Sequence, residues 1–414
     1  MFMFSALYQG RLASMLKVLH RRSGDDTQAR YTARLMETRM CWRVVATTTA
    51  LVAVLTGGSV ARAAEGRTDN VVLVTLDGAR WQEIFSGLDE RLLRAAAPKD
   101  IDITSLQAYK QFSGATPEER RAKLMPFLWG TLVARYGSIA GNRALRSHAS
   151  VTNQHWFSYP GYSEILTGQA HDAVINSNDA RRNPFPSVLQ FLRRKLALSR
   201  AQVATFASWS VFTWIAESEA GQTTINAGTQ PYDSGVSEMR ALNALVRETP
   251  TPWQGVRHDA YTIRFALDYL RRVRPRVLYI ALDETDEWAH DGQYHQVLES
   301  LHRADDYLRQ IWEELQRQPQ YRGRTTLIVT VDHGRGRTLE DWRSHGIKVP
   351  GSDETWMAFA SPDSSRRGEW RDHAPLFQNQ LAATIAQLLG FDYREQNSEA
   401  GAPVSELMDA VGTR

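Results

Sequence analysis

The sequence predicts an α/β fold in which helices cover both faces of a large, mostly parallel central sheet. Continuous apolar and β-branched runs are typical of strands buried on both faces of such a sheet, and the chain has three: residues 70–76, 277–282 and 325–331. Amphipathic stretches with helical periodicity also occur, at residues 187–196, 259–272 and 296–316. Strands that alternate with helices form βαβ units, and these units build a parallel sheet.

The composition is that of an ordinary globular chain. Of its 414 residues, 43% are hydrophobic and 23% are charged, which excludes a disordered or fibrous protein. We expect residues 65–414 to form one domain. Two segments rich in polar residues, Gly and Pro, 87–122 and 210–257, are expected to form insertions or a small cap. The apolar segment 376–389 is expected to be a final packing helix, because Gly390 follows it.

The charge distribution argues against a nucleic-acid partner. The formal net charge is +3, but residues 1–64 contain nine Arg and Lys against three Asp and Glu. The remaining chain, with 40 Arg and Lys against 43 Asp and Glu, is mildly acidic and has no basic run. It therefore lacks the electrostatic footprint of a nucleic-acid-binding protein.

Residues 1–64 are predicted to be a leader, with a secretory signal peptide over residues 36–64. A basic start precedes an apolar stretch over residues 44–55, and residues 61–63 form an A-x-A cleavage pattern. The apolar stretch is shorter than the roughly 20 residues of a membrane span, so we expect cleavage and no stable span afterwards. The only cysteine, Cys41, lies in this leader, which excludes a disulfide from the mature chain. The predicted location is periplasmic or secreted.

Acidic and His side chains follow each predicted strand. Asp77 follows the first, Asp283 and Asp286 follow the second, and Asp332 and His333 follow the third. Because the carboxyl ends of parallel strands meet at one edge of a sheet, we expect one polar, multidentate site there.

These side chains form a pattern that is typical of a metal site. Asp286 and His290 share one face if this stretch is helical, although such a pair alone is more often a salt bridge. Asp332 and His333 alone often cap a turn, and His345 alone is usually a loop residue. Together with Asp77, however, they make three Asp and three His with no thiolate. This set suits two divalent ions of the zinc or manganese kind, which can clamp the attacking and leaving oxygens of a displacement.

Ser158 is the candidate nucleophile. Pro160 follows it and a helix-like run ends at Gly168, so the hydroxyl is expected at the start of a helix, where backbone N–H groups favour anions. The alternative interpretation is a Ser that only caps this helix.

Taken together, these motifs resemble the alkaline phosphatase superfamily, and within it the type I phosphodiesterase/nucleotide pyrophosphatase branch. The resemblance spans residues 70–391. It rests on motifs that follow the order of the family: residues 71–78, 125–137, 158–168, 286–290, 332–334, 345–346 and 356–362.

The resemblance implies an alkaline phosphatase-like three-layer sandwich with a catalytic site for phosphoric esters, either phosphodiesters or phosphomonoesters. It implies two metal ions, zinc or alternatively manganese, and a small-molecule substrate. One ion would be bound by Asp286, His290 and His345, and the other by Asp77, Asp332 and His333, with Ser158 bridging or adjoining both. The implied mechanism is attack by Ser158 on phosphorus, a phosphoseryl intermediate, and hydrolysis with net retention.

Two positions depart from the family pattern. The Asn that the branch places three residues after the nucleophile is Gly161 here, so a phosphate contact must come from elsewhere. Formylglycine sulfatases need Arg where this chain has Tyr162, which argues against a sulfatase.

Arg335 and Arg337 are candidates for phosphate binding, or else solvated loop residues.

Several alternatives stay open. A sulfatase or a phosphonate hydrolase of the same superfamily would use the same fold. Ser163 begins like the nucleophile elbow of a serine hydrolase, but that interpretation leaves the carboxylates unexplained. A periplasmic metal- or solute-binding protein without catalysis would share the leader and the fold class. Trp209, Trp214 and Tyr232 are candidates for an aromatic wall, with core packing favoured, and His155 and His171 are interpreted as structural.

Overall fold

The central sheet has eight strands in the order β10-β2-β9-β7-β1-β6-β4-β5. The structure, a computed structural model, describes residues 68–407, so the predicted leader lies outside the described residues. The run from β7 to β5 is parallel throughout, whereas β9 is antiparallel to both β7 and β2. The strands are β1 Asn70–Leu76, β2 Gly137–Ala140, β4 Val203–Ala207, β5 Thr224–Ala227, β6 Val277–Leu282, β7 Thr325–Thr330, β9 Met357–Ala360 and β10 Gly368–Glu369.

Strand β1 lies in the middle of the sheet, and all seven of its residues are buried. Its continuous apolar sequence follows from this position, because β6 and β7 flank it and both of its faces are covered. Val72 pairs in register with Leu278 of β6 and with Leu327 of β7. The β1 and β6 boundaries are those predicted from the sequence, and β7 ends one residue earlier than predicted.

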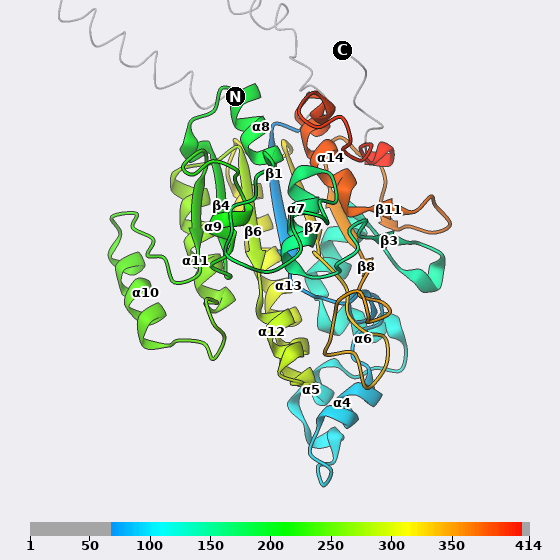
Figure 1. Cartoon of the computed structure of the whole chain (residues 1–414). Coiled ribbons are helices and arrows are strands. Elements are labelled where there is room, and N and C mark those ends of the chain that lie inside the picture. The colour runs from blue at the N-terminus through cyan, green and yellow to red at the C-terminus, as the bar shows by residue number, and fades with distance from the viewer. Residues whose placement is uncertain (1–67, 408–414) are drawn as a thin grey trace, which may run out of the picture. The chain divides into compact units, whose positions relative to one another are not determined.

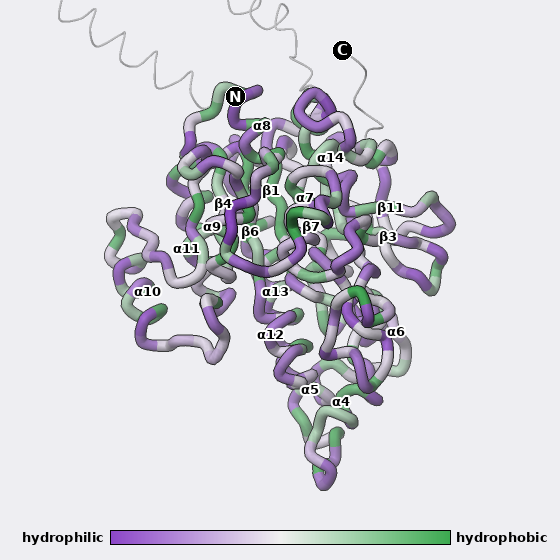
Figure 2. Tube along the Cα trace, viewed as in Figure 1, coloured by the Kyte–Doolittle hydropathy of each residue, from purple (hydrophilic) through white to green (hydrophobic). Residues whose placement is uncertain are grey.

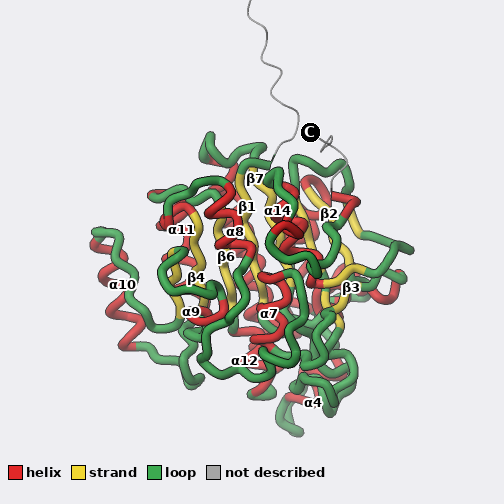
Figure 3. Tube along the Cα trace, turned by 45° about the horizontal axis from the view of Figure 1, so that its top comes forward, coloured by secondary structure: helices red, strands yellow, loops and turns green. Residues whose placement is uncertain are grey.

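Helices cover both faces of the sheet, as Figures 1 and 3 show. Alternate β1 residues point to opposite layers: Val72 belongs to one hydrophobic core and Leu73 to the other. The first core includes residues from α3 Trp81–Ser86, α4 Glu90–Ala96, α5 Gln107–Phe112, α6 Pro117–Leu124, the π-helix Leu128–Tyr136, α10 Ser237–Glu248, α11 Asp259–Arg272, α12 Glu284–His290 and α13 Tyr294–Arg317. The second includes residues from α7 Ser158–Thr167, α8 Val188–Lys195, α9 Phe212–Ile215 and α14 Leu381–Leu388. The three-layer α/β prediction is confirmed.

The predicted helix over residues 376–389 is wrong at its beginning. Leu376–Phe377 forms β11, which pairs with β3 Ala149–Ser150 in a second sheet that also contains β8 Glu354–Thr355. The Leu376 N–H donates to the carbonyl of His148, so strand pairing takes the backbone groups that a helix would use. Helix α14 starts only at Leu381. Apolar spacing alone does not reveal this pairing, because the partner strand lies more than 200 residues earlier in the chain.

The two predicted insertion segments differ in structure. Residues 87–122 hold α4, α5 and α6, which extend from the lower part of the domain in Figure 1. Residues 210–257 contribute α9 and α10, but also β5, the edge strand of the central sheet. This second segment is therefore partly integral to the sheet.

Apolar residues gather along the strands and the inner helix faces, whereas the outer loops are mainly hydrophilic (Figure 2). Among residues 68–407, none of the helices combines the length and the apolar character that a membrane crossing requires.

Candidate functional site

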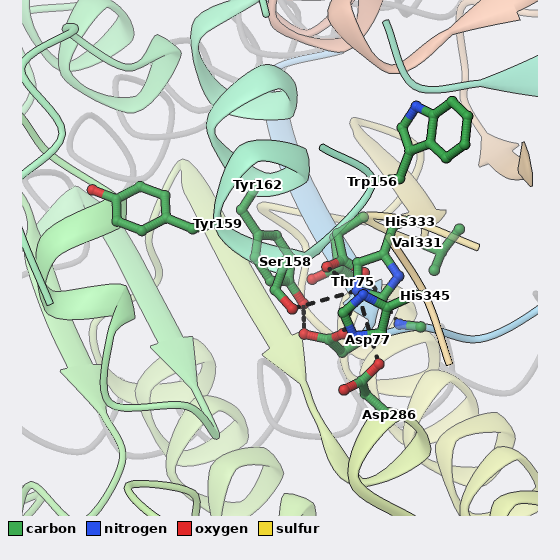
Figure 4. A network of polar contacts seen from close by, with 12 residues as sticks. Thr75, Asp77, Trp156, Ser158, Tyr159, Tyr162, Asp286, Val331, His333 and His345 are labelled. Carbon is green, nitrogen blue, oxygen red and sulfur yellow. Dashed lines mark hydrogen bonds and ion pairs between the residues drawn. The ribbon is translucent and has the colours of Figure 1, made fainter. Parts of the chain in front are cut away.

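The carboxyl ends of β1, β6 and β7 bring acidic and His side chains together, as predicted. Asp77 follows β1, Asp286 lies on α12 directly after β6, and Asp332 and His333 follow β7. All four are buried, and Figure 4 shows Asp77, Asp286 and His333 clustered with His345 beside Ser158. Gly78 makes this close packing feasible: its φ is +56°, and a Cβ there would lie 2.3 Å from Asp286 Oδ1.

Asp77, Asp332 and His333 form the first trio. His333 Nε2 lies 3.5 Å from Asp77 Oδ1 and 3.4 Å from Asp332 Oδ2. Each residue of this trio is held through its other polar atom. Tyr162 donates to Asp77 Oδ2 at 2.8 Å, the Gly78 N–H donates to Asp332 Oδ1 at 3.1 Å, and His333 Nδ1 lies 2.8 Å from the Gly334 carbonyl. Since a carbonyl only accepts, Nδ1 carries the proton and Nε2 presents a lone pair.

Asp286, His290 and His345 form the second trio. His290 Nε2 lies 3.1 Å from Asp286 Oδ2 and 3.0 Å from His345 Nε2. Asp286 and His290 share one face because α12 is helical, as predicted. The two trios are adjacent, since His333 Nε2 also lies 3.8 Å from Asp286 Oδ1.

Buried carboxyl groups lie close together in this site, and a bound cation would neutralise their negative charge. Burial, followed by the carboxylates of Asp332, Asp286 and Asp283, raises the pKa of Asp77 well above its ordinary value. Burial and then Asp286 raise the pKa of Asp332 in the same way. Burial alone would raise the pKa of Asp286 too, but Arg335 together with His290 and His345 outweighs this effect, and the pKa of Asp286 lies well below its ordinary value. Burial lowers the pKa of His333 to about 4, so its imidazole is neutral at pH 7.

The residues present fit divalent metal ions. Asp77 Oδ1, Asp332 Oδ2 and His345 Nδ1 are buried polar atoms that have no hydrogen-bond partner among residues 68–407. Burial of such atoms costs free energy unless a ligand binds them. Metal–ligand bonds of about 2.0–2.1 Å with tetrahedral geometry would place neighbouring ligand atoms about 3.3 Å apart, close to the separations in both trios. Carboxylate and imidazole donors also suit zinc and manganese.

Ser158 is the first residue of α7, the helix predicted from Pro160 and Gly168. Its Oγ lies 3.4 Å from His333 Nε2, so the candidate nucleophile adjoins the first trio (Figure 4). The preceding loop is held firmly: Trp156 has a φ of +55°, and the Asn153 side chain accepts hydrogen bonds from the Trp156 and His155 N–H groups. An αL conformation in a Trp is costly and requires such support.

Close packing against the Asp332 turn explains why Gly161 replaces the Asn of the family pattern. A Cβ at Gly161 would lie 2.4 Å from the Asp332 carbonyl oxygen. Helix α7 therefore packs too closely against this turn to carry a side chain there.

Asn178 is a residue of this region that the sequence analysis missed. Its Oδ1 accepts a hydrogen bond from the Tyr159 N–H at 2.9 Å, which places it at the first turn of the nucleophile helix. The residue is exposed, and its amide nitrogen has no hydrogen-bond partner among residues 68–407. The sequence near Ser158 shows no strand end or motif spacing that singles out Asn178, because this residue lies 20 positions further along the chain.

Arg335 and Arg337 are both engaged by the protein. Arg335 is buried and pairs with Asp286 Oδ1, and it also donates to the Asp286 carbonyl at 3.0 Å. Arg337 pairs with Glu354. Phosphate binding by these two arginines stays a prediction. The ion pairs disfavour it, because both guanidinium groups already have acidic partners.

The other candidate residues have structural surroundings. Tyr232 packs against Phe206 and donates to Asp268 at 2.9 Å, so it belongs to the core. His171 stacks on Phe185. Ser163 is buried, and its Oγ accepts a hydrogen bond from the Asn183 amide. An amide group cannot act as the general base that a serine hydrolase needs.

The fold and the clustered Asp, His and Ser side chains define an α/β protein of the alkaline phosphatase-like class. Residues 163–366 match the family model of type I phosphodiesterase / nucleotide pyrophosphatase. The matched range contains Asp286, His290, Asp332, His333 and His345, whereas Asp77 and Ser158 precede it.

Solved structures with the same fold include three at low sequence identity. Wild-type alkaline phosphatase PafA is 9% identical with a TM-score of 0.52, over 84% of this chain and 99% of that chain. The lipoteichoic acid synthase LtaP from Listeria monocytogenes is 11% identical with a TM-score of 0.50, over 83% and 77%. Ps i-CgsB is 14% identical with a TM-score of 0.51, over 81% and 75%. No curated protein matches the chain by sequence.

Proposed function

We propose that this chain is a metal-dependent hydrolase of phosphoric esters that works through a phosphoseryl intermediate. The observation that carries the proposal is the position of Ser158 Oγ, 3.4 Å from His333 Nε2 and beside a cluster of Asp and His side chains in which Asp77, Asp332 and His333 form one group and Asp286, His333 and His345 form another. The family match supports hydrolysis of phosphoesters as the reaction class. We further propose zinc or manganese as the metal, and action in the periplasm or outside the cell after the leader is removed.

The residues have distinct roles in this proposal. Asp286, His290 and His345 would hold one ion, and Asp77, Asp332 and His333 the other. Ions bound there would lower the pKa of a neighbouring hydroxyl group and neutralise charge on the phosphoryl oxygens. Ser158 Oγ forms a bond to phosphorus while the bond to the leaving oxygen breaks and that oxygen takes a proton. Water then attacks the phosphoserine, the Oγ–P bond breaks, and Ser158 regains its proton.

A panel of p-nitrophenyl esters tests this proposal. Protein loaded with zinc or manganese is expected to hydrolyse p-nitrophenyl phosphate or bis-p-nitrophenyl phosphate, and to lose this turnover in EDTA and regain it when metal is restored. The preferred ester separates a monoesterase from a diesterase. Preference for p-nitrophenyl sulfate or a p-nitrophenyl phosphonate would instead indicate the sulfatase or phosphonate hydrolase. Turnover that is indifferent to EDTA would contradict the proposal, as would tight metal binding without turnover of any ester.

Asn178 is proposed to donate a hydrogen bond to a phosphoryl oxygen. Its Oδ1 is engaged by the Tyr159 N–H, which leaves its amide N–H groups free at the first turn of α7. Gly161 lacks the side chain that would provide this contact. We expect Asn178→Ala to lower kcat/KM for the preferred ester by about 10- to 100-fold, the effect of losing one hydrogen bond to a charged group.

Asn176→Ala is the matched control, because Asn176 is exposed in the same loop and has no hydrogen bond to α7. Steady-state kinetics at saturating metal measure both variants. Equal kcat/KM values for the two variants would exclude the role of Asn178.

A further inference from the structure

Tyr162 connects the nucleophile helix to one of the metal-ligand candidates. It lies on α7 four residues after Ser158, hence on the same side of the helix. Its hydroxyl donates to Asp77 Oδ2 at 2.8 Å, and Figure 4 shows the ring directed from α7 toward Asp77. One hydrogen bond therefore joins the helix that carries Ser158 to the end of β1.

The two oxygens of the Asp77 carboxylate have different surroundings. Oδ2 is held by Tyr162, whereas Oδ1 is buried, has no hydrogen-bond partner within the described part of the chain and lies 3.5 Å from His333 Nε2. The other members of the trio follow the same rule: Gly78 holds one oxygen of Asp332, and the Gly334 carbonyl holds Nδ1 of His333. Partners of this kind fix the orientation of metal ligands, and their loss typically costs about 10- to 100-fold in metal affinity or activity.

The Tyr162 ring is itself firmly placed. The residue is fully buried, and its ring meets Phe212 edge to face with 4.6 Å between centroids. A Phe at this position would keep the packing and lose only the hydroxyl. Asp77 Oδ2 would then be a buried oxygen without its donor.

We propose that Tyr162 is a positioning residue that fixes the Asp77 carboxylate for a metal ion and, by the same hydrogen bond, sets the nucleophile helix against the metal site. This inference rests on the proposed function, in which Asp77, Asp332 and His333 hold one ion. Tyr162 touches neither the substrate nor the reacting atoms in this role. Its effect is on metal affinity and on the placement of Ser158.

Metal binding to the Tyr162→Phe variant tests the proposal without relying on turnover. Zinc is titrated into metal-free protein in competition with a chromophoric chelator. We expect the dissociation constant of one zinc ion to rise about 10- to 100-fold. With zinc in excess, the part of the lost turnover that comes from weaker metal binding is expected to return, because the ligands themselves are intact, whereas the part that comes from the placement of Ser158 is expected to remain as a lower kcat with KM for the ester unchanged.

Tyr279→Phe is the matched control. Tyr279 is also fully buried near the site, but its hydroxyl lies 3.1 Å from Thr75 Oγ1 and has no hydrogen bond to any of the proposed ligands. Its zinc affinity is expected to stay within about threefold of the unmodified chain, because a neutral buried hydrogen bond affects mainly stability. Thermal unfolding of the metal-free variants shows that both fold.

Two results would overturn the role of Tyr162. If the unmodified chain binds zinc and hydrolyses esters, but Tyr162→Phe and Tyr279→Phe bind zinc equally tightly, the role of Tyr162 is rejected and the proposed function stands. If the unmodified chain bound neither zinc nor manganese, the proposed function would fail as well, and with it the premise of the inference. A drop in zinc affinity confined to Tyr162→Phe, and absent when Asp77 is already changed to Asn, supports the proposal.

Discussion

Ser158→Ala is expected to lower phosphoester turnover by at least about 10³-fold, because removal of a nucleophile that forms the covalent intermediate disables both chemical steps. Removal of the Ser158 hydroxyl group is expected to disturb the structure little. Among the described residues, its Oγ has one hydrogen bond, with His333 Nε2, and the backbone hydrogen bonds at the start of α7 do not involve the hydroxyl. We therefore expect the variant to fold and to keep its bound metal. Steady-state rates and metal content measured on the same preparation check both statements.

Ser163→Ala provides the control for this experiment. Ser163 lies on the same helix, is buried, and accepts a hydrogen bond from Asn183 at 3.2 Å. Its loss is expected to cost about 1 kcal/mol in the free energy of unfolding and little in turnover. The opposite pattern, with Ser163→Ala inactive and Ser158→Ala active, would favour the serine hydrolase interpretation.

A phosphoserine trapped by acid quenching gives independent evidence on the same residue. With the unmodified chain and a labelled phosphoester, label is expected on the peptide that contains Ser158. Label on another residue, or a fully active Ser158→Ala variant, would remove Ser158 from the mechanism.

The strands that build the site were predictable because their sequences reflect burial directly. β1 and β6 are covered on both faces, so nearly every residue in them is apolar or β-branched, and their boundaries follow from that run. The polar residue after each run then marks the edge where the site lies. Asp77 and Asp332 were predictable from position alone for this reason.

Features that depend on contacts between distant segments were not predictable. Residues 376–377 have apolar spacing that suits a helix, yet they pair with β3 as a strand. The hydrogen bond from Tyr162 to Asp77 joins residues 85 positions apart, and the ion pair of Arg335 with Asp286 joins residues 49 positions apart. Arg335 follows the Asp-His-Gly turn, where a phosphate contact was a reasonable hypothesis. Only the folded chain shows that its guanidinium has an acidic partner.

The two trios are expected to bind separate ions, so changing one ligand in each should remove different halves of the metal content. Asp77→Ala removes a ligand from the trio beside Ser158, and His345→Ala removes one from the trio that it forms with Asp286 and His290 of α12. We expect each variant to fall from about two bound ions to about one, and to lose more than about 100-fold in turnover. Loss of a residue that hydrogen-bonds to a metal ligand typically lowers activity by about 10- to 100-fold. We expect a larger loss here, because the ligand itself is removed.

Asp283→Asn distinguishes loss of a ligand from loss of negative charge. Asp283 is a fourth buried carboxyl group at the end of β6, and it raises the pKa of Asp77, but it belongs to neither trio. This variant is expected to keep about two ions, since the direct ligands of a site set its stoichiometry. Metal analysis after gel filtration measures all three variants. Two ions retained in Asp77→Ala or His345→Ala with full turnover would refute the ligand assignment, and equal loss of both ions in either variant would show that the trios bind metal as one cooperative unit.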